Sequence, residues 1–501
     1  MNNKWLRRLL SLVLAVIIIA APVSGVDGAA DDEFYIELTY AEELVFNQVQ
    51  RQPAASEPSQ WAYFYVFMAR EAYGLCSSGL NYQGNLTDSE LLTVTRALFE
   101  ARVTAVDGTE RYITRGRVIE ILYQFILDAA ETGDSMTAAE YFAANGLMRG
   151  RTVGDYQLNS VATVEELIAF SVRAYEHMLR VLGHYSRGFF WEIQGVANTV
   201  YLLGSIHIGD GSLYPMSSAI EAGFANSRNL AVEFDIGSTP EAREAADDGW
   251  GVISPGAGYT IRDLIPAELY ATYSEFWSIM MVPPEVYDYF YPWMAVFTMQ
   301  YLMPEFGAII VGHPGFNLYL GIDMYFMRRA ALTGRNIISL ESAESRAGMT
   351  DSFSPELQES MLYDALAAAF YTLPPECREE LYRYHSVLPS LLRPAFLPVM
   401  DGAIIAFDGL LHMMRVISAG DDEALEYMTG RDTATDDVLT LEFNYIMLTE
   451  RDRAMAAKIH EFLISETYNG NYFVIVGAAH MTGATGLIQL LTDKGHGVVR
   501  R

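Results

Sequence analysis

Cysteine is nearly absent from the chain. Its 501 residues include only two, Cys76 and Cys377, which fall in different expected domains, so neither a disulfide framework nor a Cys-rich metal site is expected. We expect both to be free, buried thiols. Positive charge is also scarce, because 33 basic residues stand against 63 acidic ones and leave a net charge of −30. Such a chain repels nucleic acid and anionic lipid, which argues against a polyanionic partner.

Two common catalytic signatures are missing as well. No Gly-x-Gly-x-x-Gly or Walker loop follows any strand-like run, which argues against a Rossmann-type or P-loop nucleotide function. No Gly-x-Ser-x-Gly elbow occurs, so a serine hydrolase is not expected. Hydrophobic residues are plentiful, since they make up 51% of the chain, and 12% of the residues are aromatic. A large core is therefore available, and the length allows two or three domains.

The N-terminus has the pattern of a targeting segment. Three basic residues precede the apolar run LLSLVLAVIIIAA, which Pro22 ends, and small residues follow in PVSGVDGAA. This order is typical of a secretory signal peptide. We expect residues 1–30 to contain it, with cleavage between Ala21 and Ala30, and the protein to be exported to the cell surface, the cell wall or the medium. The alternative is an uncleaved N-terminal segment that anchors the protein in the membrane.

Residues 31–185 have the pattern of a helical, repetitive module. TDSE at 87–90 and TVEE at 163–166 form capping boxes ahead of helices with apolar residues at helical spacing. TRGR at 114–117 opens a third helix, although its final arginine cannot close the box. A short helix, a Gly-rich loop and a Thr-capped longer helix recur, which is typical of a modular array. The unit loosely resembles surface-layer homology repeats, and this resemblance implies binding to cell-wall polysaccharide. A helical domain with ordinary capping boxes is the alternative.

Residues 186–501 change character. FFWEIQG and TVYLLGSIH predict the two strands of a hairpin, rich in β-branched and aromatic residues. NLAVEFDI, GRNIISLES and YFVIVGAAH predict three further buried strands, and TGLIQLLTDKGHGVVR predicts a closing helix with a small edge strand. Helical patterns fill most of the chain between them. We therefore expect an α/β (α+β) domain with a central mixed sheet, βαβ-like halves and a large helical insertion, preceded by the all-α module.

Ionisable residues follow the predicted buried strands. His207 follows the second strand of the hairpin, Glu233 and Asp235 close the next strand, Glu341 the one after it, and His480 follows the last central strand. In α/β sheets, ligands bind outside the carboxyl ends of the strands. Burying ionisable groups costs several kcal/mol unless they are paired or bind a metal. The sequence therefore predicts a site at this edge of the sheet.

Both histidines stand in a Gly-x-x-His frame, with Gly204 before His207 and Gly477 before His480. A glycine lets the backbone turn sharply and approach a neighbour closely, which aims the histidine into a crevice. Neutral imidazole together with a carboxylate suits a divalent metal such as zinc, manganese or cobalt. The same residues suit a metal-free site equally well, with histidine as base and glutamate as its orienting partner.

The order of motifs over residues 189–501 resembles the TraB/GumN family, which is related to the Tiki proteases and more distantly to erythromycin-esterase and ChaN-like proteins. The elements are FFWEIQGVANTVYLLGSIH, YPW, LGIDMYFMRRA, ISLESAESR and FVIVGAAHMTGATGLIQLLTDKG, in family order. The chain departs from the family pattern at Asp452, where asparagine usually follows the arginine, and at Arg346, where glutamine is common.

The resemblance implies a metal-dependent hydrolase, and a peptidase in particular, with His207, Glu233 and His480 at its centre. On this hypothesis the histidines bind metal or activate water, and Glu233 is a ligand or the general base. The metal would polarise a scissile carbonyl. Arg451 stands where the family usually carries Arg-Asn and would stabilise an oxyanion or hold a substrate carboxylate. A helix-surface salt bridge is the alternative for this arginine.

Other residues are weaker candidates. Glu341 follows a strand, and Asp323 follows Gly-Ile at a helix start, where it either belongs to the site or caps the helix. Asp210 would orient His207 from behind or open a turn. His313, in a Gly/Pro-rich loop, would line a pocket or form a lid.

Three functions remain open on this sequence. The first is an exported metallohydrolase that acts on peptides and is held near the wall by its N-terminal module. The second is a metal-free hydrolase of esterase type that uses the same residues. The third is a wall-associated protein that binds and sequesters a peptide without turnover. Both histidines and Glu233 are present, which favours an enzyme.

Overall fold

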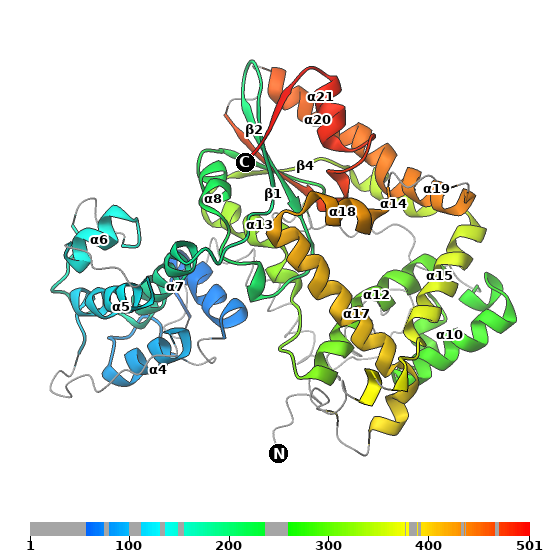
Figure 1. The fold of residues 1–501 in the computed structure, drawn as a ribbon, viewed down its shortest axis with the longest axis horizontal. Helices are drawn as coiled ribbons and strands as arrows, with labels where there is room; N and C mark the ends of the chain where they lie inside the picture. The colour runs from blue at the N-terminus through cyan, green and yellow to red at the C-terminus, as the bar shows by residue number, and fades with distance from the viewer. Residues whose placement is uncertain are drawn as a thin grey trace.

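A computed structural model describes residues 57–74, 80–99, 112–130, 136–148, 155–235, 259–375, 377–379, 388, 392–431, 435, 437–465 and 470–501. The predicted signal peptide and Cys76 lie outside these ranges. Figure 1 shows three parts: a helical module, a sheet flanked by helices, and a separate block of helices. Cys377 is exposed rather than buried, so that prediction was wrong.

The described residues of the N-terminal module form helices joined by turns and loops, as predicted. Its helical segments are α3 (Gln60–Phe67), the π-helical turn η2 (Met68–Ala72), α4 (Asp88–Phe99), α5 (Arg115–Ala130), α6 (Ala138–Ala144) and α7 (Val164–Val181). The predicted capping boxes are present ahead of α4 and α7. A third one, Thr137 with Glu140, opens α6 and had not been predicted. At α5 the Thr114 hydroxyl accepts a hydrogen bond from the Arg117 N–H.

A six-stranded mixed sheet forms the centre of the C-terminal part. Its strands are β1 (Phe189–Gln194), β2 (Thr199–Ser205), β3 (Asn229–Val232), β4 (Asn336–Ser339), β5 (Tyr472–Gly477) and β6 (Gly497–Arg500), in the spatial order β4-β3-β5-β2-β1-β6. The β1–β2 hairpin is antiparallel and β6 pairs antiparallel with β1, whereas β2, β5, β3 and β4 are parallel. The predicted α/β (α+β) class and mixed sheet are therefore confirmed.

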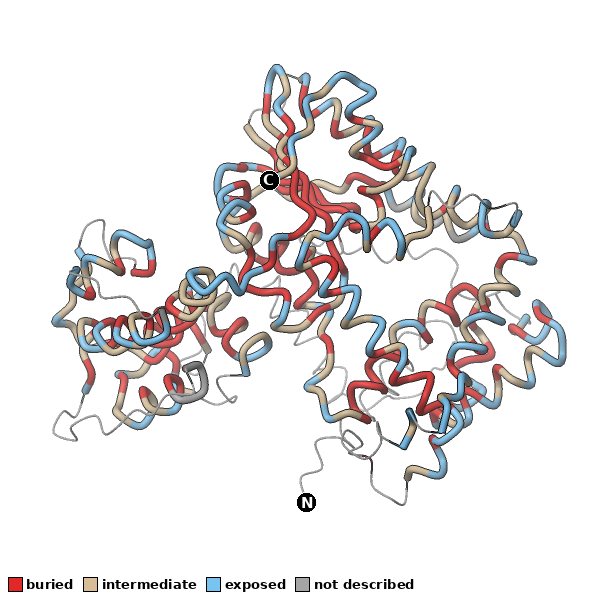
Figure 2. Tube along the Cα trace, in the orientation of Figure 1, coloured by how far each residue is buried: buried red, intermediate tan, exposed pale blue. Residues whose placement is uncertain are grey.

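One strand differs from the prediction. β4 was expected to be buried, but it lies at the sheet edge and its four residues are exposed or half-buried. β3 and β5 are interior strands, and they form the red, buried centre of Figure 2. An edge strand has a neighbour on one side only, which leaves part of its surface accessible.

Helices cover both faces of the sheet. They are α8 (Ser218–Ala225), α13 (Ile322–Leu332), α14 (Ala343–Asp351), α18 (Asp422–Thr429), α20 (Glu450–Ile464) and α21 (Leu487–Asp493). Phe473 of β5 contacts Phe224 of α8 and Phe326 of α13, whereas its neighbour Tyr472 stacks on Phe462 of α20 with ring centroids 4.2 Å apart. Because successive strand residues face opposite sides, α8 and α13 cover one face and α20 covers the other.

The predicted helical insertion forms a block with a hydrophobic core of its own. Its helices are η4 (Ile261–Asp263), α10 (Ala267–Ile279), α11 (Pro284–Tyr287), α12 (Pro292–Val311), α15 (Pro355–Ala369), α17 (Arg393–Ala419), α19 (Val438–Asn444) and the π-helical turn η6 (Tyr445–Thr449). The short helix η5 (Leu318–Leu320) precedes α13 and packs in the other core. Trp293 is buried in this core, as predicted for a packing residue. Within the described residues, α12 and α17 are long and apolar enough to cross a membrane by length and composition alone. The relevant stretch of α12 is 78% buried, as in the core helix of a folded block.

The other hydrophobic core is shared by the N-terminal module and the sheet. One continuous cluster includes Leu167 and Ile168 of α7 as well as Leu202 of β2 and Val474 of β5. The module is thus packed against the α/β part rather than tethered to it, as Figure 1 also shows. We therefore design every experiment below on the full chain.

Candidate functional site

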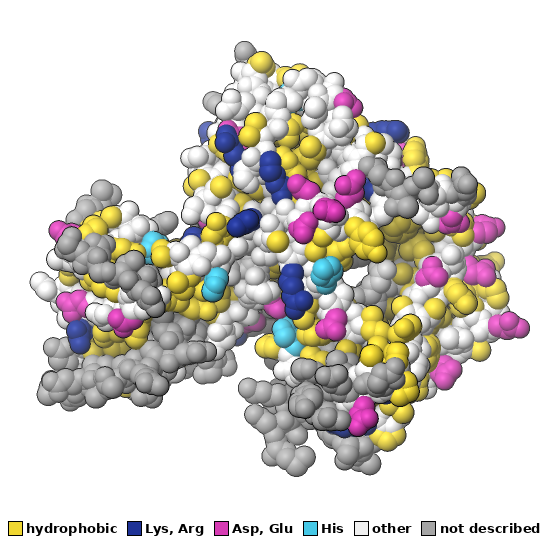
Figure 3. All heavy atoms as spheres, viewed as in Figure 1, with side chains coloured by type: hydrophobic (Ala, Val, Ile, Leu, Met, Phe, Trp, Pro, Cys, Tyr) yellow, Lys and Arg dark blue, Asp and Glu magenta, His cyan; other side chains and the backbone are white. Residues whose placement is uncertain are grey.

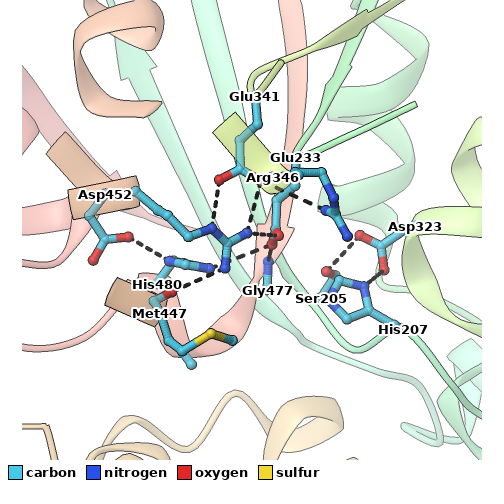
Figure 4. Close-up of polar contacts among 12 residues, drawn as sticks. Ser205, His207, Glu233, Asp323, Glu341, Arg346, Met447, Asp452, Gly477 and His480 are labelled. Carbon is cyan, nitrogen blue, oxygen red and sulfur yellow. Dashed lines mark hydrogen bonds and ion pairs between the residues drawn. The ribbon is translucent and has the colours of Figure 1, made fainter. Parts of the chain in front are cut away.

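The carboxyl ends of the parallel strands bring the predicted residues together. In the order of the sheet, Glu341 follows β4, Glu233 follows β3, His480 follows β5 and His207 follows β2. Figure 4 shows these side chains gathered beyond the strand ends. The sequence prediction that the strand ends meet at one edge is confirmed. The space between these side chains, called the crevice below, is formed by segments that lie more than 200 residues apart in the chain.

His207 is held by an aspartate from another element. Its Nδ1 lies 2.9 Å from Oδ2 of Asp323, and the other carboxylate oxygen of Asp323 accepts a hydrogen bond from the Ser205 hydroxyl at 2.8 Å. Asp323 is in the first turn of α13, whose N-cap is Gly321. The carboxylate therefore orients the imidazole rather than capping the helix. The His207 side chain is 64% exposed, so its Nε2 side is open to solvent.

His480 has the same arrangement, but is buried. Its Nδ1 lies 2.6 Å from Oδ1 of Asp452, a fully buried carboxylate on α20 that also pairs with Arg431. The sequence had singled out position 452 only as a departure from the family pattern. The structure makes Asp452 the partner of the second histidine. Both histidines thus have a carboxylate on Nδ1 and present Nε2 to the crevice.

Gly477 marks the point where the three central side chains meet. A Cβ placed on this glycine would lie 3.1 Å from Glu233 Oε1, 3.5 Å from His480 Cδ2 and 3.9 Å from His207 Nε2. The Gly477 N–H donates to Glu233 Oε1 at 2.5 Å, and His480 Nε2 lies 3.8 Å from the same oxygen. The glycine therefore provides both an amide donor and the space in which the groups converge, as its place in the Gly-x-x-His frame predicted.

Arg451 ties two buried carboxylates together. Its Nε donates to Glu341 Oε1 at 2.6 Å, and its NH2 group donates to Glu233 Oε2 at 2.7 Å and to Glu341 Oε2 at 3.0 Å. NH1 donates to the carbonyl of Met447, which lies in the π-helical turn η6 directly before α20. Four of the five N–H groups of the guanidinium are thus engaged. This is a buried network rather than the helix-surface salt bridge considered as the alternative.

A second arginine, Arg346 of α14, is less engaged. Its guanidinium lies 3.8 Å from Glu341 Oε2, beyond hydrogen-bond distance, and 5.0 Å from the centre of the Phe234 ring. Its side chain is 28% exposed. Figure 4 shows it on the same side of the site as His207 and Asp323. It is the arginine of this cluster that retains hydrogen-bonding capacity towards a bound molecule.

Two predicted neighbours of the site have other partners. Asp210 accepts hydrogen bonds from Ser212 and caps the short helix that follows it, so the predicted alternative of a turn is confirmed; its carboxylate lies 3.4 Å from His313 Nε2 and does not orient His207. Asp210 lies three residues after His207, and its side chain points towards His313 of the helical block instead of towards His207. His313 lines a pocket of about 440 Å³ together with Phe407 and Asp408, in agreement with the predicted pocket-lining role.

The charges of the site act on one another. The neighbouring Asp323 carboxylate raises the pKa of His207 to about 9, and the Glu233 carboxylate acts in the same direction. Burial alone would raise the pKa of Glu233. The adjacent His480, Arg451 and His207 and the Gly477 N–H outweigh it and hold that pKa well below its usual range. Glu233 is therefore an ionised carboxylate at neutral pH.

Two imidazoles and a carboxylate, from His207, His480 and Glu233, are chemical groups that bind divalent cations in proteins. Metal-bound histidines generally have their second ring nitrogen on a carboxylate or carbonyl, as His207 and His480 do here. His480 Nε2 lies 3.8 Å from Glu233 Oε1, and these two side chains together with His207 would hold such an ion. In the described part of the chain, no group of three or more His, Cys, Asp and Glu side chains is already arranged at metal-binding distances. Binding would thus need these side chains to move closer together, and His207 would have to lose the proton that its raised pKa retains at neutral pH.

Comparison with known proteins gives one match. The model of the TraB/PrgY/gumN family matches residues 189–384 and 400–500, which include every residue of the site described above. The search of curated proteins and the search of solved structures both found no match. Residues 31–185 lie outside the family match, so their resemblance to surface-layer homology repeats stays a prediction. With its match over more than half of its length, the chain belongs to the TraB/PrgY/gumN family.

Proposed function

We propose that the chain is an exported, metal-dependent hydrolase that cleaves peptide bonds at the carboxyl edge of the sheet. The observation that carries the proposal is the convergence of His207, Glu233 and His480 around Gly477, with a separate aspartate on each histidine. A purely structural cluster does not require two imidazoles held in the same way with their Nε2 atoms towards one crevice.

His207, His480 and Glu233 would hold the ion. A bound divalent ion supplies Lewis acidity towards a carbonyl and lowers the pKa of a water molecule. Glu233 accepts hydrogen bonds from Arg451 and from the Gly477 N–H, which keep it ionised and make it a better ligand than a general base. His207 is the exposed histidine, so substrate would approach from its side, with His480 behind it.

An extended substrate has room to approach. The surface is hollowed between the part that contains the sheet and the helical block, and hydrophobic side chains border this hollow (Figure 3). Ligand pockets are generally concave and mostly apolar, with a few polar groups that fix orientation. This shape supports a peptide or another elongated substrate.

Metal binding and turnover test the proposal together. We expect the full chain to bind one equivalent of manganese, cobalt or zinc and to cleave members of a peptide library. His207→Ala and His480→Ala should each lose both properties while retaining the circular dichroism of the parent. His184→Ala is the matched control, since His184 is exposed in a loop, and it should keep both. Failure of the parent chain to bind any of the three ions would refute metal dependence, and ester hydrolysis and peptide binding would then test the two alternatives.

We assign to Arg346 the stabilisation of the negative charge that develops on the substrate during the reaction. Arg451 is less suited to this role because Glu233, Glu341 and the Met447 carbonyl already occupy most of its N–H groups. Arg346→Gln is expected to lower kcat by roughly 10²-fold with little change in KM, the size found for loss of one oxyanion donor. Steady-state kinetics on the peptide found above measures it, with Arg262→Gln, a partly exposed arginine of the helical block, as control. An unchanged kcat in Arg346→Gln would reduce the role of Arg346 to its long ion pair with Glu341.

A further inference from the structure

The segment α3–η2 of the N-terminal module contacts the loop that follows His207. Gly211 opens the short helix η3 (Gly211–Leu213), four residues after His207. A Cβ on Gly211 would lie 2.0 Å from the carbonyl oxygen of Ala72, the last residue of η2. Only a glycine therefore allows the module to approach this loop as closely as it does.

The same segment also contacts α13, the helix that carries Asp323. The Phe64 ring lies 5.2 Å from the Tyr325 ring, and the guanidinium of Arg328 lies 3.6 Å from the centre of the Phe67 ring. The Glu71 carboxylate accepts a hydrogen bond from the Asn317 side chain at 3.3 Å, just before η5 and α13. Ring–ring and cation–ring contacts thus join α3–η2 to the first two turns of α13.

Arg328 makes this contact energetically important. The residue is fully buried, and within the part of the chain that the structure describes none of its three guanidinium nitrogens has a hydrogen-bond partner. Burial lowers its pKa, since a desolvated cation is costly. The ring faces of Phe67 and of Tyr319, at 5.5 Å, lie against the charge, and Tyr63, Tyr214 and the Glu71 carboxylate also interact with it electrostatically. A desolvated cation–π contact is stronger than an exposed one, so withdrawal of Phe67 would disturb α13 directly.

The two contacted segments are joined to each other beside the site. The Ile322 N–H donates to the carbonyl of Ile206, and Gly209 and Asn317 exchange two backbone hydrogen bonds. His207 and Asp323 meet across this junction. A displacement of α3–η2 would therefore act on both partners of the pair at once. The π-helical form of η2 is noteworthy here, because such turns occur frequently at functional sites.

We propose that α3–η2 of the N-terminal module positions the His207–Asp323 pair, so that this half of the site is assembled only when the module is docked. Phe67 and Gly211 act as positioning residues, and neither touches the crevice. The His480–Asp452 pair serves as an internal reference for the His207–Asp323 pair. Asp452 lies on α20, which packs against α21, η6 and β2. The module is thus a part of the site's architecture in addition to any wall attachment.

Nuclear magnetic resonance on the full chain with ¹⁵N-labelled histidine and no added metal tests the inference. The ring signals of His207 and His480 are assigned with the two alanine variants. In Gly211→Ala and in the milder Phe67→Leu, we expect the Nδ1–H signal of His207 to shift or vanish while that of His480 stays in place. Gly409→Ala, with open space around its new Cβ, should change neither signal.

Two results would overturn the inference. One is an unchanged His207 signal in both variants, which would show that the pair is built without the docked module. The other is an equal change at His207 and His480, which would show general loosening of the fold. Because the readout is a ring signal in metal-free protein, it does not depend on hydrolysis. A failure of the proposed function and a failure of this inference are therefore distinguishable.

Discussion

Glu233→Gln is expected to abolish practical turnover, with a loss of about 10³-fold in kcat/KM, the upper range for removing one charge-stabilising group from a site. Glu233 is the carboxylate that lies between the two histidines, and it accepts hydrogen bonds from Arg451 and from the Gly477 N–H. Glutamine keeps the shape but removes the negative charge, and its amide nitrogen would face a donor. Peptide hydrolysis and metal titration on the full chain measure the effect.

Two control variants separate the possible reasons for this loss. Glu192→Gln changes a carboxylate of β1 that pairs with Arg501 at the surface, and should leave activity intact. Glu341→Gln removes the other carboxylate held by Arg451, yet leaves Glu233 beside the histidines. We expect a smaller loss in Glu341→Gln than in Glu233→Gln. Equal losses in both would mean that the charge balance of Arg451, and not a ligand role of Glu233, determines activity.

The parts of the site that lie at strand ends could be predicted from the sequence. The apolar runs before His207, Glu233 and His480 are short, strongly patterned and rich in β-branched residues, and the edge of a parallel sheet brings such ends together. The glycine in each Gly-x-x-His frame also had a physical reason that the structure bears out. These features depend on local pattern and on one general rule of sheet geometry.

The partners of the histidines could not be predicted in the same way. Asp323 lies 116 residues after His207, and Asp452 lies 28 residues before His480 on a different helix. Nothing in the local sequence connects either pair, because the contact is made by helices folding back on the sheet. Asp210, three residues after His207, was considered for this orienting role, but it opens a turn instead, which was the alternative. Sequence proximity is a poor guide to the orienting carboxylate when the histidine follows a strand.

The burial of individual elements could likewise not be predicted from the local sequence pattern. The apolar run of β4 resembles that of an interior strand, but the order of strands in the sheet places it at the edge. Cys377 is exposed even though cysteine is usually buried. The close docking of the module through Gly211 and Phe67 also had no sequence signal. All three depend on which segments meet in the folded chain.

Arg451→Met is expected to lower the stability of the fold more than any single change at the crevice. Removing the guanidinium leaves Glu233 and Glu341 as neighbouring buried carboxylates without their shared partner. Breaking a buried ion pair from one side costs about 3–5 kcal/mol. Thermal unfolding of the metal-free full chain at pH 7 measures the loss. Arg451→Lys, which keeps the charge but not the planar fork, should lie between the parent and Arg451→Met.

The pH dependence tells whether charge is the cause. In the parent protein the pKa of Glu233 is held below its ordinary value of 4.5, so its stabilising contribution is present above pH 4.5 and is lost as the pH falls further. In Arg451→Met this contribution is weakened, because one of the positive neighbours is gone. The stability difference between the two proteins should therefore be largest near neutral pH and shrink in acid. Adding Glu341→Gln to Arg451→Met should recover part of the loss, since one unpaired carboxylate is removed. A difference that stays constant with pH, together with no recovery in the double variant, would assign the effect to lost packing instead.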